Sequence, residues 1–422
     1  MARGRADPGL FALPRACDLG HWRNEQGSGL LDRWQQGLDG LERWNEGLAQ
    51  GLLPDDIEAQ APGLRETFDR SAWSALQADG PAKALAAQLA VLAERAGVTR
   101  LSLLLPAELG QLPWETLPEF APERLFLSRA VSLESWLRQR AAIPASALPA
   151  STHEHATSAR AGGAPASRVL VADDASLPFG TAEEEQALAF HGGAPAIGGT
   201  SVLSVLRALT APGGKHLLMH AVYAQLNPWA SYLRVRAPAR VAQQPLALTL
   251  RADADRDWIS ELLEQGADNR GRELLAAWIP PVLGVTPDTL TLSACEAARC
   301  GADQSGLATP VGLGPALLAG GAGRVIGALW PCNQEAAWLF YRTLFRAAQQ
   351  APQAAWYQLV HDARRTLQGL DSAALTELLS EADVAPDWQM RAQAGWIDPK
   401  RPSFWAPFVV LGNALGAPGD VA

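Results

Sequence analysis

The chain has 422 residues, which is longer than a single core usually spans, so its length predicts two or three domains. Its formal net charge is −9 and its Lys and Arg residues form no run. Nucleic-acid binding needs clustered basic side chains, so this composition argues against a direct nucleic-acid partner. We expect a globular protein.

Cysteine content and hydropathy indicate the compartment. The four cysteines are too few and too irregularly spaced for a disulfide framework, which favours a reducing environment. No apolar run reaches the roughly 18–20 residues of a membrane span, and the N-terminus lacks the apolar stretch of about 7–15 residues found in signal peptides. Only three lysines occur among the 35 basic residues, which fits a high-GC bacterial coding bias. These features predict a bacterial, cytoplasmic protein without membrane contact.

Residues 1–79 are predicted to form a short helical segment. They contain a quasi-repeat in which residues 31–38 are echoed by residues 41–48, with Leu, Trp and Gly recurring ten residues apart. Two copies at this spacing match no solenoid fold. We therefore expect helical turns whose Trp and Leu side chains pack on the neighbouring domain.

A second portion spans residues 80–140 and is followed by a linker. Its pattern predicts an amphipathic helix at 81–96, a buried strand at 101–106, and a further strand and helix within 125–140. Residues 141–167 are rich in Pro, Ala, Ser and Gly, so they are predicted to be a flexible linker.

Residues 168–416 alternate between strand and helix patterns. The predicted strands are 168–172, 216–220, 290–293 and 324–329, and the predicted helices are 182–190, 201–209, 310–318 and 335–348. This alternation favours an α/β fold with a parallel sheet flanked by helices. Catalytic groups in such sheets collect at the carboxyl ends of the strands.

Two predicted strands end at residues that can perform thiol chemistry. Cys295 follows the strand at 290–293, and His220 ends the strand at 216–220. A free thiol is a poor nucleophile at neutral pH, but a neighbouring histidine base favours its thiolate. His216 shares a strand face with His220 and is the competing base; His220 lies nearer the loops and is preferred. The alternative is that Cys295, His216 and His220 are all buried core residues without a catalytic role.

The same pair suggests an oxyanion site. The backbone amides of Cys295 and Ala221 are positioned to stabilise an oxyanion if the two strand ends converge. Glu296 and His216 are expected to lie beside the catalytic pair without taking part in the chemistry.

Six segments in order resemble the CHAT family, whose members are caspase-like cysteine peptidases related in fold to caspases and separase. They are Leu112-Pro113-Trp114-Glu115, His216-Leu217-Leu218-Met219-His220, Pro228-Trp229-Ala230-Ser231, Ser293-Ala294-Cys295-Glu296, Ala319-Gly320-Gly321-Ala322 with Leu329-Trp330-Pro331, and Phe404-Trp405-Ala406-Pro407-Phe408. The resemblance covers about residues 80–416.

This resemblance implies a caspase-like catalytic portion at 168–416, with residues 80–140 as a non-catalytic, pseudo-caspase portion. It implies Cys295 as the nucleophile and His220 as the base of an endopeptidase that cleaves a protein substrate through a thioester. Such peptidases are held inactive until a sensor or partner protein acts, and a role in bacterial defence or cell death follows by analogy.

Three departures from the family pattern keep a second reading open. Ala221 stands where glycine is usual, residues 296–303 lack the usual threonine-glycine, and Asn333 stands where aspartate is common. These changes motivate the alternative that the chain is a catalytically inactive, caspase-like binding or scaffold protein.

The longest insertion of the predicted catalytic portion is acidic. Asp253, Asp255, Asp257 and Glu264 are spaced as in a calcium-binding loop, but Trp258 occupies the position that needs glycine. A solvated acidic turn at a helix start is favoured, and a pocket for a basic substrate side chain is a further option. The candidate substrate-binding residues are Ser231, Asp253, Asp255 and Asp303.

No metal or cofactor is expected. Cys295, Cys300 and Cys332 lack the paired close spacing of a zinc site. Residues 312–315 resemble the start of a dinucleotide fingerprint, but its third glycine is missing and a proline interrupts the pattern.

Overall fold

The computed structural model describes most of the chain. The described residues are 29–49, 52–120, 125–132, 169–172, 177, 179–191, 196–198, 205, 209–210, 214–234, 273–276, 289–302, 310–381 and 397–412. The expected linker at 141–167 and the acidic residues Asp253, Asp255, Asp257, Glu264 and Asp303 lie outside them.

An eight-stranded sheet runs through the molecule in the order β1-β2-β13-β12-β9-β5-β3-β4. The strands are β1 (Arg100–Leu104), β2 (Phe126–Ala130), β13 (Phe408–Gly412), β12 (Arg324–Ala328), β9 (Thr289–Ser293), β5 (Lys215–Leu218), β3 (Val169–Ala172) and β4 (Ala196–Gly198). Neighbouring strands are parallel throughout, except that β12 and β13 are antiparallel. The predicted α/β class with a mostly parallel sheet is therefore confirmed.

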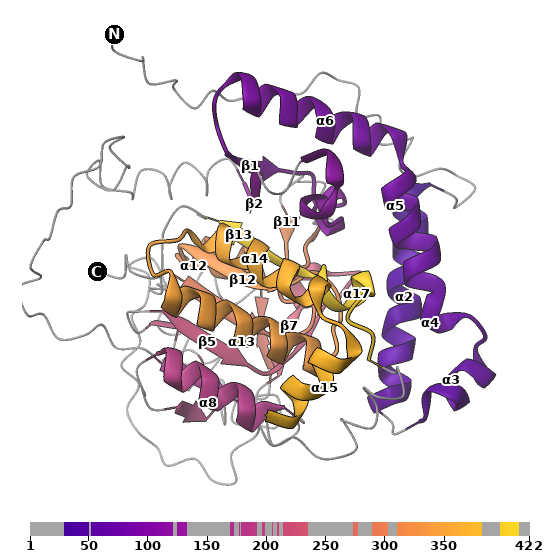
Figure 1. Cartoon of the computed structure of the whole chain (residues 1–422), viewed down its shortest axis with the longest axis vertical. Coiled ribbons are helices and arrows are strands. Elements are labelled where there is room, and N and C mark those ends of the chain that lie inside the picture. The colour runs from indigo at the N-terminus through magenta and orange to yellow at the C-terminus, as the bar shows by residue number, and fades with distance from the viewer. Residues whose placement is uncertain are drawn as a thin grey trace, which may run out of the picture.

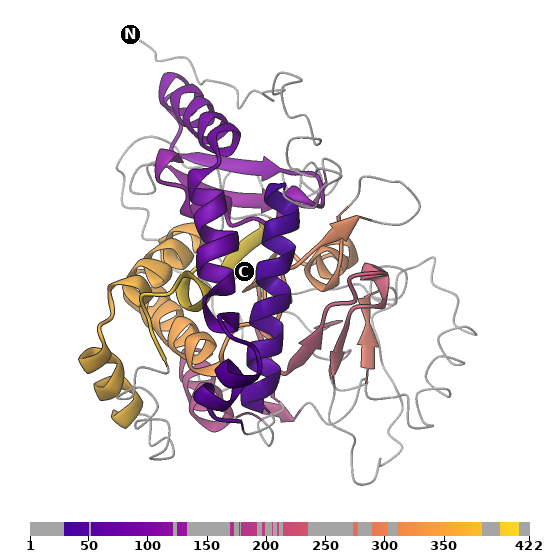
Figure 2. The same cartoon turned by 90° about the vertical axis from the view of Figure 1, so that its right-hand side faces the viewer.

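Helices cover both faces of the sheet (Figures 1 and 2). One face carries α8 (Gly180–Phe190), α13 (Gln334–Gln350) and α14 (Trp356–Gly369), and α13 contacts both of the others. On α13, Phe340, Leu344 and Ala348 are buried four residues apart, so a continuous apolar stripe faces the sheet. Helix α12 (Leu313–Gly320) packs on β12 and β13 from the opposite side.

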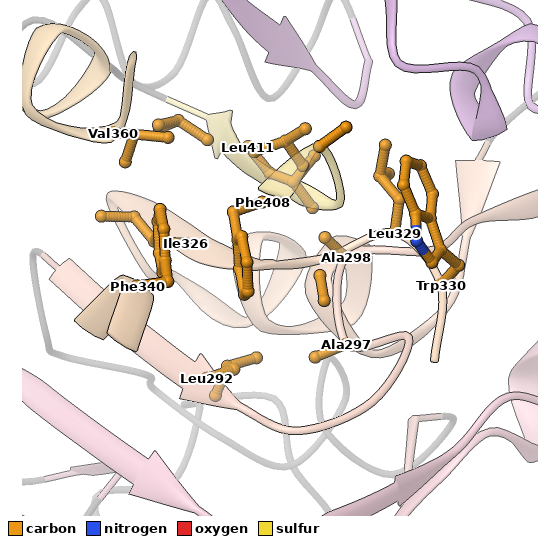
Figure 3. Close-up of a cluster of buried hydrophobic side chains, with 14 of the residues drawn as sticks. Leu292, Ala297, Ala298, Ile326, Leu329, Trp330, Phe340, Val360, Phe408 and Leu411 are labelled. Atoms are coloured by element: carbon orange, nitrogen blue, oxygen red, sulfur yellow. The ribbon is translucent and has the colours of Figure 1, made fainter. Parts of the chain in front are cut away.

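The core continues beneath the loops at the strand ends (Figure 3). Phe340 of α13 stacks on Phe408 of β13, with ring centroids 3.8 Å apart. Ala297 and Ala298, which follow β9, are fully buried in the same cluster. Gly327 of β12 packs closely on this turn, because a Cβ added to it would lie 3.4 Å from the Cβ of Ala297, in van der Waals contact.

The N-terminal segment forms a long helix that packs on a broken one. Helix α2 (Leu30–Ala49) lies along α4 (Leu64–Thr67), the π-helix η1 (Phe68–Trp73) and α5 (Ser74–Ala78). Both copies of the quasi-repeat lie on α2, where Leu31, Trp34, Leu38 and Leu41 form its buried stripe. The Gly37 backbone approaches η1 so closely that an added Cβ would lie 2.5 Å from the Cβ of Ala72.

The predicted portions share one sheet. Helix α6 (Gly80–Arg95) begins after Asp79, whose carboxylate accepts a hydrogen bond from the amide of Ala82, and it leads into β1. Strand β13, from the end of the described chain, lies between β2 and β12. The C-terminal strand therefore joins the N-terminal pair of strands to the rest of the sheet, and the two portions do not have separate cores.

A buried ion pair fixes the connection between β1 and β2. Arg129 of β2 donates from Nε to Glu115 Oε1 and from Nη2 to Glu115 Oε2, at 2.6 and 2.7 Å, and both side chains are 4% exposed. Burial by itself raises the pKa of Glu115, but the charge and hydrogen bonds of Arg129 outweigh it, and the pKa is lowered. The ion pair therefore keeps Glu115 ionised inside the core.

Candidate active site

Three adjacent parallel strands, β12, β9 and β5, have their carboxyl ends at the same edge of the sheet. Leu218 of β5 is the register partner of Ser293 of β9, and the Met219 amide donates to the Ser293 carbonyl at 3.2 Å. His220 and Cys295 each lie two residues beyond that matched pair. Each of them therefore follows the carboxyl end of one of two neighbouring strands, which lie about 4.8 Å apart in a sheet.

The predicted strand 216–220 is not continuous, which corrects one expectation. Strand β5 ends at Leu218, and β6 (His220–Val222) belongs to a separate antiparallel sheet with β7 (Tyr232–Arg234) and β8 (Glu273–Leu275). The chain turns away at Met219, so the period-two argument that placed His216 and His220 on one face does not apply. His216 is fully buried, whereas His220 is half-buried.

His216 is held inside the sheet by partners on both ring nitrogens. Its Nε2 lies 2.9 Å from Oε1 of Glu183 on α8, and its Nδ1 lies 2.8 Å from Oγ1 of Thr291 on β9. The Thr291 hydroxyl donates to the Lys215 carbonyl at 3.1 Å, so it accepts from Nδ1 of His216. The imidazole therefore links α8 to two strands, and both nitrogens are occupied in the core.

Cys295 shares its site with a second cysteine, Cys332. The Cys295 thiol donates to the Cys332 carbonyl oxygen, with Sγ and O 3.8 Å apart. The interaction with the Cys332 side chain lowers the pKa of Cys295 against the opposing effect of burial. The same interaction, with burial, raises the pKa of Cys332 well above its usual range. The arrangement favours the thiolate at Cys295.

Cys332 was missed as part of the site. It follows β12, the strand beside β9, so its position obeys the same rule that singled out Cys295 and His220. The order of the strands was the missing information, because Cys332 lies 37 residues away in the chain.

The residue after the nucleophile candidate has an unusual backbone conformation. Glu296 has a φ of 55°, the left-handed region that non-glycine residues seldom adopt. Its buried carboxylate pairs with Nη1 of Arg299. Burial raises the pKa of Glu296, and Arg299 opposes that rise. The Arg299 guanidinium lies over the ring of Tyr223, 4.4 Å from its centroid, so Glu296, Arg299 and Tyr223 tie the loops after β9 and β6 together.

Helix α2 reaches the same loops. Arg299 donates to Oε1 of Gln35 at 3.1 Å, and Asn45 donates to the carbonyl of Pro331 at 3.5 Å. Trp34 packs against Trp330, with ring centroids 5.7 Å apart. The N-terminal helix therefore supports both the loop after Cys295 and the loop that carries Cys332.

The remaining predicted site residues have different surroundings. Ser231 is 1% exposed, its hydroxyl accepts from the Ala224 amide at 3.1 Å, and its carbonyl accepts from the Ala276 amide at 2.7 Å. It thereby stabilises the connection between β6 and β7, and its contact with substrate stays a prediction. Ala221 lies in β6 opposite Leu233, next to His220.

Among the described residues, no group of three or more His, Cys, Asp or Glu side chains could hold a metal ion. No helix in the described part of the chain is both long and apolar enough to cross a membrane.

A sequence model described as the CHAT domain matches residues 79–413. The chain belongs to the CHAT domain family. The matched region contains the whole eight-stranded sheet and the loops that carry His220, Cys295 and Cys332, whereas α2 lies outside it. The family resemblance of the sequence, and with it the caspase-like α/β fold class, is confirmed.

Similar solved structures were found, but no curated protein matches the chain. Two are separase–securin complexes of Saccharomyces cerevisiae, both with a TM-score of 0.42, at 12% and 13% identity. They are matched over 85% and 91% of this CHAT protein, which spans only 18% and 22% of those chains. The third is the Arg-specific cysteine proteinase gingipain R, with a TM-score of 0.41 and 9% identity, over 80% of this chain and 69% of that one.

Proposed function

We propose that this CHAT protein is a cysteine endopeptidase that cleaves a protein substrate, with Cys295 as the nucleophile and His220 as the base. The observation that carries the proposal is the register of β5 and β9, which puts both residues two positions past a matched pair at the carboxyl edge of a CHAT sheet. A lowered pKa at Cys295 supports the nucleophile assignment. His216 is fully buried, whereas His220 is half-buried beyond the end of β5, which supports His220 as the base.

The proposed reaction has two steps. The Cys295 thiolate attacks the carbonyl carbon of the scissile peptide, and the amides of Cys295 and Ala221 stabilise the resulting oxyanion. The His220 imidazolium then protonates the leaving amine, and a thioester remains on Cys295. In the second step His220 takes a proton from water, and the hydroxide attacks the thioester and releases the carboxylate product.

A peptide-cleavage experiment tests this proposal. The reduced full-length chain is incubated with a library of peptides from a bacterial proteome, and new termini are identified by mass spectrometry. We expect Cys295→Ala to abolish cleavage and His220→Ala to lower its rate by about 10²–10⁴-fold, the usual contribution of a positioned acid–base group. Cleavage that is unchanged by Cys295→Ala contradicts the proposal.

His216→Ala provides the matched control. Removing His216 leaves the buried side chain of Glu183 without this hydrogen-bond partner, and an unsatisfied buried polar group costs about 1–3 kcal/mol. The expected effect is lower stability, with the turnover of the folded fraction close to wild type. An equal loss of turnover in His216→Ala and His220→Ala would contradict the choice of base.

We also propose that a partner protein regulates access to the site. Helix α2 lies outside the region that matches the family and contacts the loops on both sides of Cys295, through Gln35 and Asn45. A sensor or partner that binds α2 could therefore shift those loops. A role in bacterial defence or cell death is proposed from the family resemblance alone.

A further inference from the structure

Two free thiols meet at the candidate active site, and the proposed reaction uses only one. Cys295 and Cys332 are both half-buried and both unpaired by disulfides. The Cys295 thiol is hydrogen-bonded to the backbone of Cys332, with Sγ of Cys295 3.8 Å from the Cys332 carbonyl oxygen. Cys332 therefore lies where a second sulfur could react with the first.

We propose that Cys332 is the resolving cysteine of a reversible disulfide with Cys295, formed when a hydroperoxide oxidises Cys295. Disulfide formation would block the nucleophile, so the consequence for turnover rests on the proposed endopeptidase function. The disulfide itself does not depend on that function, because it needs only the two thiols and the oxidant.

The chemistry balances with a hydroperoxide as the oxidant. The Cys295 thiolate attacks the terminal oxygen of the hydroperoxide and the O–O bond breaks, so Cys295 becomes a sulfenic acid and the alkoxide, or hydroxide from hydrogen peroxide, leaves and takes up a proton. The sulfur of Cys332 then attacks the sulfenic sulfur and the S–O bond breaks. The Cys332 proton passes to the departing hydroxide, which leaves as water. Two thiols are oxidised, and the hydroperoxide is reduced to an alcohol, or to water.

Disulfide formation requires the loop that carries Cys332 to move. The S–S bond of a disulfide is about 2.05 Å long, so the two sulfurs must be brought to that distance. Trp330 is fixed by Trp34, and α13 begins at Gln334, so Cys332 lies on the short segment between two anchored points. The proposed disulfide requires this segment to move toward Cys295 while Trp330 and α13 stay in place.

The other described cysteine is a poor alternative partner. Cys300 is buried, and its thiol lies 3.9 Å from the carbonyl oxygen of Ala107 in the connection after β1. The Cys295 thiol is hydrogen-bonded to the carbonyl of Cys332 instead. The specific prediction is therefore a 295–332 pair.

The pairing has a chemical consequence. A sulfenic acid with no thiol nearby oxidises further to sulfinic acid, which thiol reductants do not reverse. Capture by Cys332 would stop Cys295 at a reducible state. The pair would therefore make oxidation of the site reversible.

Peptide mapping tests the pair without an activity assay. The full-length chain is treated with hydrogen peroxide, its free thiols are blocked with N-ethylmaleimide, and the digest is analysed by mass spectrometry. We expect a disulfide-linked peptide pair containing Cys295 and Cys332 in the wild type and in Cys300→Ser and Cys17→Ser. In Cys332→Ser we expect sulfinic acid at Cys295 that dithiothreitol does not remove. Sulfinic acid at Cys295 of the wild type without the linked pair would overturn the proposal, as would linkage of Cys295 to another cysteine.

The cleavage assay separates the two proposals. A linked pair in a chain whose cleavage of peptides is unchanged by Cys295→Ala would support the disulfide and contradict the endopeptidase. Cys295-dependent cleavage by a chain that forms no linked pair would support the endopeptidase and contradict the disulfide. If both stand, hydrogen peroxide abolishes cleavage by the wild type and dithiothreitol restores it, whereas in Cys332→Ser dithiothreitol restores none of the cleavage that peroxide removed.

Discussion

The contact between α2 and the loop that carries Cys332 can be tested by one substitution. Trp34 is 1% exposed, and its ring packs against Phe68 at 5.3 Å and against Trp330 at 5.7 Å between centroids. Phe68 and Trp330 pack on each other at 5.2 Å. Trp34→Ala would remove the ring that connects the N-terminal helix to this loop.

The expected loss of stability is large. Truncation of a buried Trp to Ala costs about 3–5 kcal/mol, and each aromatic pair contributes roughly 0.5–1.5 kcal/mol of specific interaction. Whole domains are stable by only about 5–15 kcal/mol. Trp34→Ala should therefore lower the free energy of unfolding by about 3–5 kcal/mol.

Equilibrium unfolding in urea measures this loss. Trp34→Ala, Trp330→Ala and the double variant form a cycle, whose coupling energy should be about 0.5–1.5 kcal/mol. Leu53→Ala is the control, because Leu53 is 52% exposed and its removal should change stability by less than about 0.5 kcal/mol. In Trp34→Ala we also expect faster alkylation of Cys332, which lies two residues beyond Trp330. A Trp34→Ala chain as stable as Leu53→Ala, or a cycle without coupling, would refute the reasoning.

Three further predictions concern buried ionisable groups. Glu115→Gln leaves Arg129 buried with its charge uncompensated and should lower the free energy of unfolding by about 3–5 kcal/mol. Glu119→Gln breaks a part-exposed ion pair with Lys83 and should lower it by about 1 kcal/mol or less in the same urea titration. The folded-state pKa of Glu115 lies below its ordinary value of 4.5, so its contribution to stability is present above pH 4.5 and is lost as the pH falls through the folded-state pKa. Below pH 4.5 the free energy of unfolding should therefore fall more steeply with pH in the wild type than in Glu115→Gln. Equal slopes in the two proteins would contradict this. Burial raises the pKa of Cys300 to about 11, so peptide mapping should find it unmodified by iodoacetamide in the folded protein at pH 8, and rapid modification there would show that the site is open.

Some strands were predictable from the sequence because their hydrophobic pattern is local. The apolar run before Cys295 predicted a strand that the structure contains as β9, and the first residues of the predicted strand at 216–220 lie in β5. That His220 belongs to the catalytic site stays a prediction. The break at Met219 was not predictable from periodicity. It arises because β6 pairs with β7 in a second sheet, and that pairing depends on residues far along the chain.

Contacts between residues that are distant in the chain could also not be predicted from the sequence. The quasi-repeat predicted helical turns packed on a neighbour, but not that Trp34 would meet Trp330. Strand β13 lies between β2 and β12, and no local signal in Phe408–Gly412 indicates that position. Cys332 became part of the site only when the order of the strands placed β12 beside β9.

The most direct test of the account is where a peptide-based covalent inhibitor attaches. The reduced chain is incubated with a set of peptidyl acyloxymethyl ketones, and the adduct is located by mass spectrometry. The account predicts one adduct, on Cys295, whose formation is about 10²–10⁴-fold slower in His220→Ala and absent in Cys295→Ala. An adduct on Cys300 or Cys332, or an unchanged rate in His220→Ala, would contradict the claim that Cys295 and His220 form the catalytic pair.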